Sequence, residues 1–253
     1  EAGLPVGFMS MATAGSTSPA TTAGTIVVAD AEIVSAMVLM QMAHPGAPVY
    51  HSMMPGIMHP RTGEFLGGGG EASLFFPIGV ELAHMWGVPT LAGLGTEAPA
   101  LGWESGMGMA ASIMARTLCG AETASGLGLR ETSTLLYPEA LVLDNESYEV
   151  ARLYAHGLEF DAENFALDVV KEVGPRGHYL AQKHTRQEMH QWELSELVKQ
   201  PAPGGGYRDP IEVAREKTTW ILENHHPQPL EKAQQQELTR ILQVAEGELG
   251  GGS

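Results

Sequence analysis

A short apolar segment followed by a helical pattern occurs four times in succession within the first 157 residues. Each apolar segment has the length of a buried β-strand, and a helix-length segment separates it from the next. This alternation predicts a parallel sheet, because a crossover is needed to bring each strand alongside its predecessor. The expected strands are Pro5–Ser10, Pro48–Ser52, Pro89–Ala92 and Thr123–Gly126, and the expected helices are Thr22–Met42, Glu71–Trp86, Glu104–Leu118 and Pro138–His156.

Four strand–helix units are half of a (β/α)8 TIM-type barrel, which usually needs about 250 residues. Here the last ~95 residues have no strand pattern, so the four units are expected to be the C-terminal half of such a barrel, followed by a helical extension. The expected division is 1–157 for the half-barrel, 158–249 for the extension and 250–253 for a flexible tail. An open, doubly wound four-stranded sheet is the structural alternative.

The extension is expected to contain four helices separated by a flexible linker. Asp161 is a residue type that is favoured at the N-cap of a helix. Asp209 precedes a proline, which is favoured at the first helical position. The glycine- and proline-rich segment Gln200–Tyr207 is expected to be the linker. The expected helices are Ala162–Val173, His184–Leu194, Ile211–Glu223 and Pro229–Glu246.

Charge and cysteine content exclude several classes of function. The formal net charge is −16, and a field of that sign repels a phosphate backbone, so no nucleic-acid partner is expected. The single Cys119 excludes an intrachain disulfide and a multi-cysteine zinc site, which favours a cytoplasmic location. The longest apolar segment, Thr25–Met42, contains Asp30 and Glu32, so it is expected to be a buried helix rather than a membrane span.

Ligands of parallel α/β proteins bind in the loops that follow the strands. The corresponding loops here are Met11–Thr21, Met53–Gly70, Leu94–Trp103 and Leu127–Tyr137. The second is unusually long, which is more typical of functional loops than of simple connections. None contains a phosphate-binding loop, a dinucleotide fingerprint or the spacing of a zinc helix.

Charged side chains are scarce in these loops, so the few present are candidates for substrate recognition. Arg61, in the segment His59–Gly63, is either a carboxylate-binding group or a loop-anchoring one. His59 is a second candidate for holding an anionic group. Glu97 follows the third strand, where it is the candidate catalytic residue that would pair with a cationic substrate, or else a group that caps the next helix.

Aromatic side chains near the strand ends could receive a quaternary ammonium group. Tyr50 and His51 end the second strand, and because strand residues alternate between faces, only one of them should point inward. Phe8 and Trp103 are the other candidates, although each is also compatible with a place in the core. The many methionines of this half fit adaptable core packing better than a methionine-lined groove.

Several segments resemble one family, the corrinoid-dependent trimethylamine methyltransferases, in its C-terminal half. Ala14–Glu32 is similar to that family's Gly-x-Thr-Ser-Pro stretch, and Met58–Gly63 to its Met-Arg-Thr-Gly loop. The resemblance spans nearly the whole chain in the expected order. The further segments are Leu141–Glu146, Asp168–Leu180, His184-Thr185 and Ala214–Ala245.

The resemblance implies a (β/α)8 fold and transfer of a methyl group from a methylated amine to the cobalt of a corrinoid (cobalamin) carried by a separate protein, with no metal bound by the chain itself. Founding members use pyrrolysine; this sequence shows none, and relatives lacking it are associated with quaternary amines such as betaines. Under this hypothesis Glu97, with Trp103, Tyr50 or Phe8, would hold the cationic group. Thr96–Gly106 departs from the family pattern, which puts the shape of the substrate pocket in doubt.

Two other classes of function stay open from the sequence. One is a different barrel enzyme acting on a small anionic metabolite, and the other is a non-catalytic paralogue that binds an amine or a corrinoid protein. The strand at Pro5–Ser10 is expected to pair with polypeptide outside this sequence, either an N-terminal barrel half or a second copy in a homo-oligomer, because half a barrel leaves two open edges.

Overall fold

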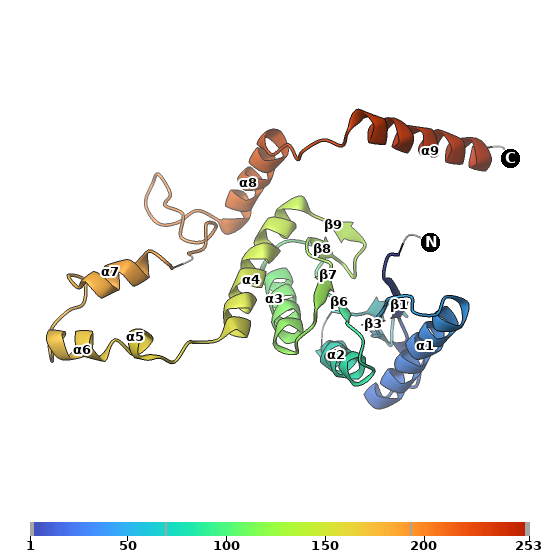
Figure 1. Ribbon diagram of the computed structural model, residues 1–253, viewed down its shortest axis with the longest axis horizontal. Helices are drawn as coiled ribbons and strands as arrows, with labels where there is room; N and C mark the ends of the chain where they lie inside the picture. Colours follow the sequence, from blue (N-terminus) through green and yellow to red (C-terminus); the bar gives the residue numbers. More distant parts are fainter. Residues whose placement is uncertain (1–2, 69, 193, 251–253) are drawn as a thin grey trace. The chain divides into compact units, whose positions relative to one another are not determined.

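The computed structural model describes residues 3–68, 70–192 and 194–250, with the backbone alone at 71, 249 and 250. The chain forms two compact units, Glu1–Arg215 and Glu216–Ser253, and the boundary falls inside helix α8 (Pro210–Asn224). The first unit contains the alternating strands and helices, and the second is helical, ending in α9 (Lys232–Gly250) (Figure 1).

The four expected strand–helix units are present in the first unit and in the expected order. Their strands are β1 (Val6–Ser10), β3 (Val49–Met53), β6 (Leu91–Gly93) and β7 (Thr123–Ser125). The helices that follow are α1 (Thr22–Ala43), α2 (Phe75–Met85), α3 (Trp103–Leu118) and α4 (Pro138–His156). The helix expected at Glu71–Trp86 begins as a 3-10 turn, η1 (Gly70–Leu74), that leads into α2.

Short strands lie within the loops that follow the main strands. In the first two loops, β2 pairs in parallel with β4, and β4 pairs antiparallel with β5. In the fourth loop, β8 and β9 form an antiparallel pair. Their bounds are β2 (Thr13–Ala14), β4 (Gly56–Met58), β5 (Phe65–Leu66), β8 (Leu129–Arg130) and β9 (Leu135–Leu136).

The four main strands are parallel and lie side by side in sequence order. β1 pairs with β3, and β6 pairs with β7. A parallel bridge between His51 and Thr90 joins the two pairs, supported by a hydrogen bond of 2.9 Å from the His51 nitrogen to the Pro89 oxygen. The order β1–β3–β6–β7 lacks the reversal of a doubly wound sheet. Among the described residues the strands do not close into a barrel.

Helices α1 to α4 form one layer against the strands. α1 contacts β1 and β3, α2 contacts β3 and β6, and each helix from α1 to α3 contacts the next one (Figure 1). One buried cluster lies between α1 and the strands and includes Ile33 and Met53, while another lies around α3 and includes Met109 and Ile113. The mixed α/β architecture is therefore singly wound, as a segment of a barrel would be.

The Thr-Ser-Pro segment of the family resemblance forms the turn into α1. Thr21 is the N-cap, and its hydroxyl oxygen accepts a hydrogen bond from the Gly24 nitrogen. The Thr25 hydroxyl donates to the Pro19 oxygen at 2.8 Å and lies 2.9 Å from the Ser18 hydroxyl oxygen. This segment therefore fixes how the chain enters the helix.

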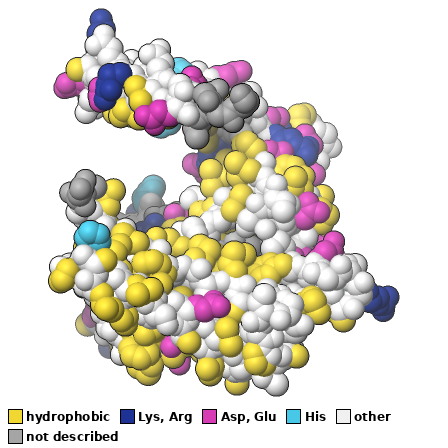
Figure 2. Space-filling view, turned by 90° about the vertical axis from the view of Figure 1, so that its right-hand side faces the viewer, with side chains coloured by type: hydrophobic (Ala, Val, Ile, Leu, Met, Phe, Trp, Pro, Cys, Tyr) yellow, Lys and Arg dark blue, Asp and Glu magenta, His cyan; other side chains and the backbone are white. Residues whose placement is uncertain are grey.

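α1 is more exposed than expected from the sequence. By length and composition alone it could cross a membrane, and only 22% of its most apolar window is buried, so the expectation of a buried helix was wrong. Its two carboxylates are bonded to the strands: Asp30 lies 3.0 Å from the ring of His51, and Glu32 accepts from Ser10 at 2.7 Å. These two hydrogen bonds hold α1 against the strands β1 and β3 of the first unit. Hydrophobic side chains cover much of the face on this side (Figure 2).

The helices after α4 differ in part from the expected bounds. The helix expected at Ala162–Val173 is two helices, α5 (Ala162–Phe165) and α6 (Leu167–Val173), because Ala166 between them is left-handed with φ 47°. The helix expected at His184–Leu194 is the shorter α7 (Lys183–Met189). None of the described residues of α5, α6 or α7 is buried.

Two features of the extension agree with the sequence prediction, and one lies outside the described residues. Asp161 is an N-cap that accepts from the Asn164 nitrogen at 2.7 Å. α8 begins at Pro210, at the position the Asp-Pro pair predicted. The tail expected at 250–253 lies outside the described residues from 251 onward, and α9 continues to Gly250.

Candidate active site

A cavity of about 340 Å³ lies at the carboxyl ends of the four parallel strands. Met9 near the end of β1, Met54 directly after β3, Gly93 at the end of β6 and Ser125 at the end of β7 all line it. Active sites of parallel barrels lie at this end of the strands, because loops from several strands converge there. The cavity is therefore the candidate active site.

The lining of the cavity is mainly apolar, with hydroxyl groups at one side. Two aromatic side chains contribute: Phe65 from β5 and Phe76 from the first turn of α2. None of the described residues that line it has an ionisable side chain. The hydroxyl groups come from Thr96, Ser125, Thr132 and Ser133. A lining of this kind suits a small ligand with apolar or cationic methyl groups.

Glycines at two strand ends allow the backbone to approach the cavity wall closely. A Cβ atom on Gly93 would lie 1.4 Å from the Met54 Cε, so any side chain there would displace that methionine. Gly126 has φ +109°, and a Cβ atom there would lie 2.5 Å from the Leu94 oxygen. Position 126 therefore requires glycine, whereas a side chain at Gly93 requires only that the flexible end of Met54 move.

A strained turn between β8 and β9 forms another wall of the cavity. Glu131, Thr132 and Ser133 are three consecutive non-glycine residues with positive φ angles of 48°, 49° and 72°. Such angles cost roughly 1–3 kcal/mol per residue and persist only where neighbouring structure imposes them. The restraint comes from the segment after β6: the nitrogens of residues 131 and 132 each donate to a carbonyl oxygen there, of Ala98 and Thr96, at 3.3 Å.

A buried ion pair fixes the loop that contains this turn. Arg130 and Asp144 of α4 form two parallel bonds of 2.8 and 3.0 Å between guanidinium nitrogens and carboxylate oxygens. Arg130 also donates to the Ser105 hydroxyl of α3, and Asp144 accepts from the Gly128 nitrogen at 2.8 Å. The pair explains the family-like segment Leu141–Glu146: its aspartate holds the loop after β7 against two helices.

Glu97 lies behind the cavity wall rather than in it. Its two carboxylate oxygens accept hydrogen bonds from the Gly68 nitrogen and the Thr132 hydroxyl. Both of those residues line the cavity, whereas Glu97 does not. The carboxylate therefore joins two loops across one side of the cavity, and its negative charge is close to the wall. Its predicted catalytic role stays a prediction.

Arg61 and His59 lie in the β4–β5 hairpin, whose Phe65 lines the cavity. The His59 ring Nδ1 accepts from the Arg61 and Thr62 nitrogens at 3.3 and 3.2 Å, which fixes the turn. Arg61 is exposed, and no ion pair joins it to another described residue. Neither side chain lines the cavity, so their predicted role in binding an anionic group depends on the substrate reaching the hairpin.

Of the two residues that end the second strand, Tyr50 points inward and His51 outward. A Cβ atom on Gly7 would lie 1.9 Å from the Tyr50 ring, so that ring covers β1 on the face away from the helices. The fully buried His51 contacts Asp30 of α1 instead, and burial lowers its pKa despite this carboxylate. The alternation predicted from the sequence is confirmed, and His51 belongs to the helix side.

The other two aromatic candidates also lie away from the cavity. Phe8 packs against the buried cluster between α1 and the strands. Trp103 begins α3 and is 80% exposed. The aromatic side chains that do line the cavity, Phe65 and Phe76, were missed by the sequence analysis. Phe76 falls in a predicted helix and resembles an ordinary core residue, and Phe65 lies in a loop where no pattern marks it.

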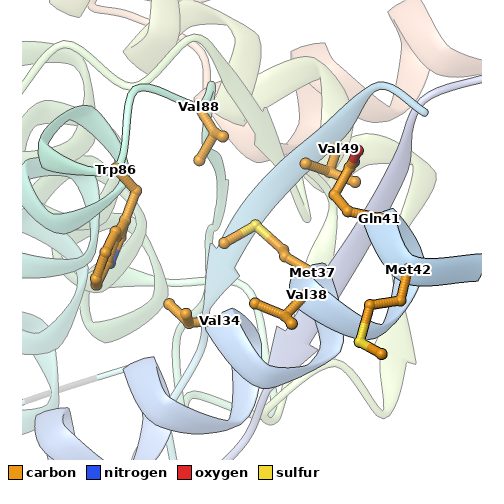
Figure 3. Close-up of a pocket in the computed structure, with 8 residues that line it drawn as sticks. All are labelled: Val34, Met37, Val38, Gln41, Met42, Val49, Trp86 and Val88. Atoms are coloured by element: carbon orange, nitrogen blue, oxygen red, sulfur yellow. The ribbon is translucent and has the colours of Figure 1, made fainter. Parts of the chain in front are cut away.

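A larger surface hollow of about 610 Å³ lies at the opposite end of the strands. Figure 3 shows its lining side chains, which come from α1, from Val49 at the start of β3 and from the segment before β6. All are apolar except Trp86 and Gln41, and the Gln41 amide already donates to the Ala47 oxygen. No described residue of this hollow can act as an acid, a base or a nucleophile, so it is not a candidate active site.

The family profile of "Trimethylamine methyltransferase (MTTB)" matches residues 1–250, which is nearly the whole chain. The chain belongs to the trimethylamine methyltransferase family. Two segments that resembled this family in the sequence lie next to the cavity without lining it. Met58–Gly63 is in the β4–β5 hairpin, whose Phe65 lines the cavity, and Asp144 of α4 holds the loop that contains the β8–β9 turn.

The chain is similar to curated methyltransferases that are named for methylated amines. It is 33% identical over 188 residues to a glycine betaine methyltransferase of Desulfitobacterium hafniense (strain Y51), covering 74% of this chain and 39% of that protein. It is 30% identical over 234 residues to the trimethylamine methyltransferase MttB of Methanosarcina barkeri, covering 90% of this chain and 47% of that protein. The chain thus spans about half the length of the curated relatives it matches, or less.

Proposed function

We propose that this chain is part of a methyltransferase that moves a methyl group from a quaternary or tertiary methylamine to the reduced cobalt of a corrinoid bound to a separate protein. The observation that carries the proposal is the cavity at the strand ends, with two aromatic rings, three methionines and no ionisable lining group. In a member of the trimethylamine methyltransferase family, such a lining fits a methylated ammonium group.

In this proposal the chain binds and orients the substrate and excludes water. The C–N bond breaks and its electron pair stays on nitrogen, so a quaternary substrate leaves as a neutral tertiary amine. For a quaternary substrate no proton transfer is needed, which agrees with a lining in which no described residue is an acid or a base. A tertiary amine would react as its protonated ammonium form, so that the secondary amine that leaves is neutral. The acceptor corrinoid supplies the electron pair of the new bond. Positioning and water exclusion are then the main contributions of the cavity.

Glu97 would stabilise the cationic substrate from behind the cavity wall, without contacting it. Its carboxylate accepts from Thr132 and Gly68, so a negative charge lies directly behind two residues of the wall. In a cavity with little water, that charge favours a cationic ammonium group without contacting it. Phe65 and Phe76 would present ring faces to the same group.

We further propose that residues 1–157 are the C-terminal half of a (β/α)8 barrel and that the protein acts in the cytoplasm. The singly wound order β1–β3–β6–β7 and the cavity at the strand ends support the barrel. β1 has a neighbour on one side only among the described residues, so its open edge is available to strands outside this sequence or in a second copy.

The test is methyl transfer by the intact protein to a reduced corrinoid protein, with trimethylamine, glycine betaine and choline as substrates. Spectroscopic detection of corrinoid methylation with one of these amines is expected. Glu97→Gln should reduce kcat/KM by about tenfold or more, since it removes the charge behind the cavity wall and keeps the shape. The matched control is Glu104→Gln, an exposed carboxylate on α3, which should leave the rate unchanged.

Arg61→Ala separates the possible substrates. If Arg61 binds a substrate carboxylate, betaine binding should weaken by roughly 2–5 kcal/mol while choline binding changes little. Equal losses for both would assign Arg61 to anchoring the hairpin. Turnover of a small anionic metabolite without corrinoid would overturn the methyltransferase proposal in favour of another barrel reaction. Amine binding without any turnover would favour a non-catalytic role.

A further inference from the structure

A second cavity, of about 200 Å³, lies behind the candidate active site and contains a buried arginine. The two cavities share Gly68 and Phe76 in their linings. The second is lined in addition by Ser73, Ser112 and Arg116, which is 2% exposed. Because a water molecule occupies about 30 Å³ in the liquid, this volume admits only a small ligand.

The Arg116 guanidinium lacks the anionic partner that buried arginines normally have. Its Nη1 donates to the Ser112 oxygen at 2.7 Å, and its Cζ lies 3.7 Å from the centre of the Phe76 ring. The buried Nε has no hydrogen-bond partner, and no carboxylate among the described side chains forms an ion pair with this residue. Burial lowers its pKa to about 9, so it is still charged at neutral pH.

One of the two neighbouring hydroxyl groups can donate a hydrogen bond to an anion, and neither supplies a negative charge for Arg116. The Ser112 hydroxyl oxygen already accepts from the Gly95 nitrogen at 3.2 Å, which leaves its proton free to donate. The Ser73 hydroxyl, in contrast, donates to the Gly70 oxygen. A buried, charged guanidinium with an unused N–H donor, beside a small cavity, is the arrangement by which proteins bind carboxylate and other oxyanions.

We propose that this second cavity is a binding site for a small oxyanion of the carboxylate class, held by Arg116 with the Ser112 hydroxyl as a second donor. The site is separate from the methyl-transfer cavity, since Phe76 and Gly68 stand between them. It does not depend on the proposed reaction. Occupancy would fix Phe76, which lines both cavities, and so stiffen one wall of the active site.

The first experiment uses the unmodified intact protein with sodium acetate as the probe and sodium chloride at equal ionic strength as the control. Acetate is expected to raise the melting temperature in a saturable manner, while chloride does not, because a ligand that binds only the folded state stabilises it. Equal effects of the two salts would overturn the proposal without any variant being made.

The second experiment measures acetate binding by calorimetry in variants. Arg116→Met should weaken binding by at least tenfold, and Ser112→Ala by a smaller factor. Arg152→Met, which removes an exposed arginine of α4, is the control and should leave acetate affinity unchanged. Arg61→Met tests the exposed arginine of the β4–β5 hairpin as the alternative site. Retained binding in the Arg116 variant together with loss in the Arg61 variant would place the anion at the hairpin and overturn the assignment. If Arg116→Met does not fold, Ser112→Ala with the salt comparison decides the question.

Discussion

The regions around Arg130 and Arg116 both bury a guanidinium group. Arg130 is paired with a carboxylate, whereas Arg116 forms no ion pair with a described residue. Arg130 is almost fully paired: it forms two bonds to Asp144 and others to Ser105 and the Leu129 oxygen. Arg116 has one carbonyl oxygen, one aromatic ring and a small cavity. The two residues are 1% and 2% exposed, so the difference lies in their partners and not in their burial.

Arg130 is therefore a structural residue whose partners belong to the protein, whereas the unused N–H donor of Arg116 is available to a ligand. The Arg130 pair connects the loop after β7 to α3 and α4, and its partners are all supplied by the chain. Arg116 extends from the last turn of α3, where the helix carbonyl groups favour a cation but cannot neutralise it. A buried charge without a counter-charge among the described residues is costly, and an anion bound in the cavity would remove that cost.

The largest effect on the free energy of unfolding is expected from removing the carboxylate partner of Arg130, which leaves it unpaired like Arg116. Asp144→Ala leaves Arg130 buried without a carboxylate and should lower the free energy of unfolding by about 3–5 kcal/mol. Urea unfolding of the variant and the unmodified protein measures the difference. A loss below about 1 kcal/mol would mean that the loop rearranges to expose Arg130.

The double variant Arg130→Met/Asp144→Leu is the control for that prediction. It removes both charges and keeps an apolar side chain in each place, so most of the stability should return. If the double variant is as unstable as Asp144→Ala, the role of the pair is geometric, through the bonds to Gly128 and Ser105, rather than electrostatic.

An intermediate effect is expected at His51, which has a carboxylate partner and also an unpaired buried nitrogen. Its Nε2 contacts Asp30, whereas Nδ1 has no partner. Burial lowers the pKa of His51 below 6.5, so on acidification the unfolded chain takes up this proton first. Stability should therefore fall as the pH decreases below about 6.5, by at most ~1.4 kcal/mol per pH unit, until the folded-state pKa is passed.

Unfolding curves between pH 7.5 and 5 for the unmodified protein and for His51→Gln measure this effect. The variant should show a shallower loss of stability with acidification. His156→Gln, at an exposed position at the end of α4, is the matched control and should follow the unmodified protein. Identical profiles for the unmodified protein and His51→Gln would exclude His51 as the titrating group.

The smallest effect is expected from Arg116→Met in chloride buffer. The lost contact with Phe76 contributes roughly 0.5–2 kcal/mol, and removal of an unpaired buried charge offsets it. The free energy of unfolding should change by less than about 1 kcal/mol, against the several kcal/mol expected for Asp144→Ala. A loss of 3–5 kcal/mol would show that a carboxylate of the protein pairs with Arg116 after all.

The sequence predicts the elements of the first unit well because local signals mark both their ends. α4 has the predicted bounds, since Pro138 occupies its first turn and Gly157, with φ 70°, follows its last residue. The break at Ala166 was not predictable, because alanine is a strong helix former and a left-handed alanine is imposed by its surroundings.

The candidate site was predictable to the level of loops but not of side chains. All but a few of the cavity's lining residues fall in or beside the loops predicted to bind ligand, because strand ends converge in any parallel sheet. Phe65 enters through β5, a two-residue strand too short to show a period. Arg130 and Asp144 are 14 residues apart, and no helical or strand spacing connects a loop residue with a helix residue at that distance.

The strand order β1–β3–β6–β7 also has a consequence for how the chain folds. Each strand pairs with the next one in sequence, so each pairing closes a loop of roughly 30 to 45 residues that contains its own helix. Among the described residues, no pairing between the strands from β1 to β7 requires a segment that is farther away in the sequence. The four units can therefore assemble one after another as they leave the ribosome, each using the previous strand as its template.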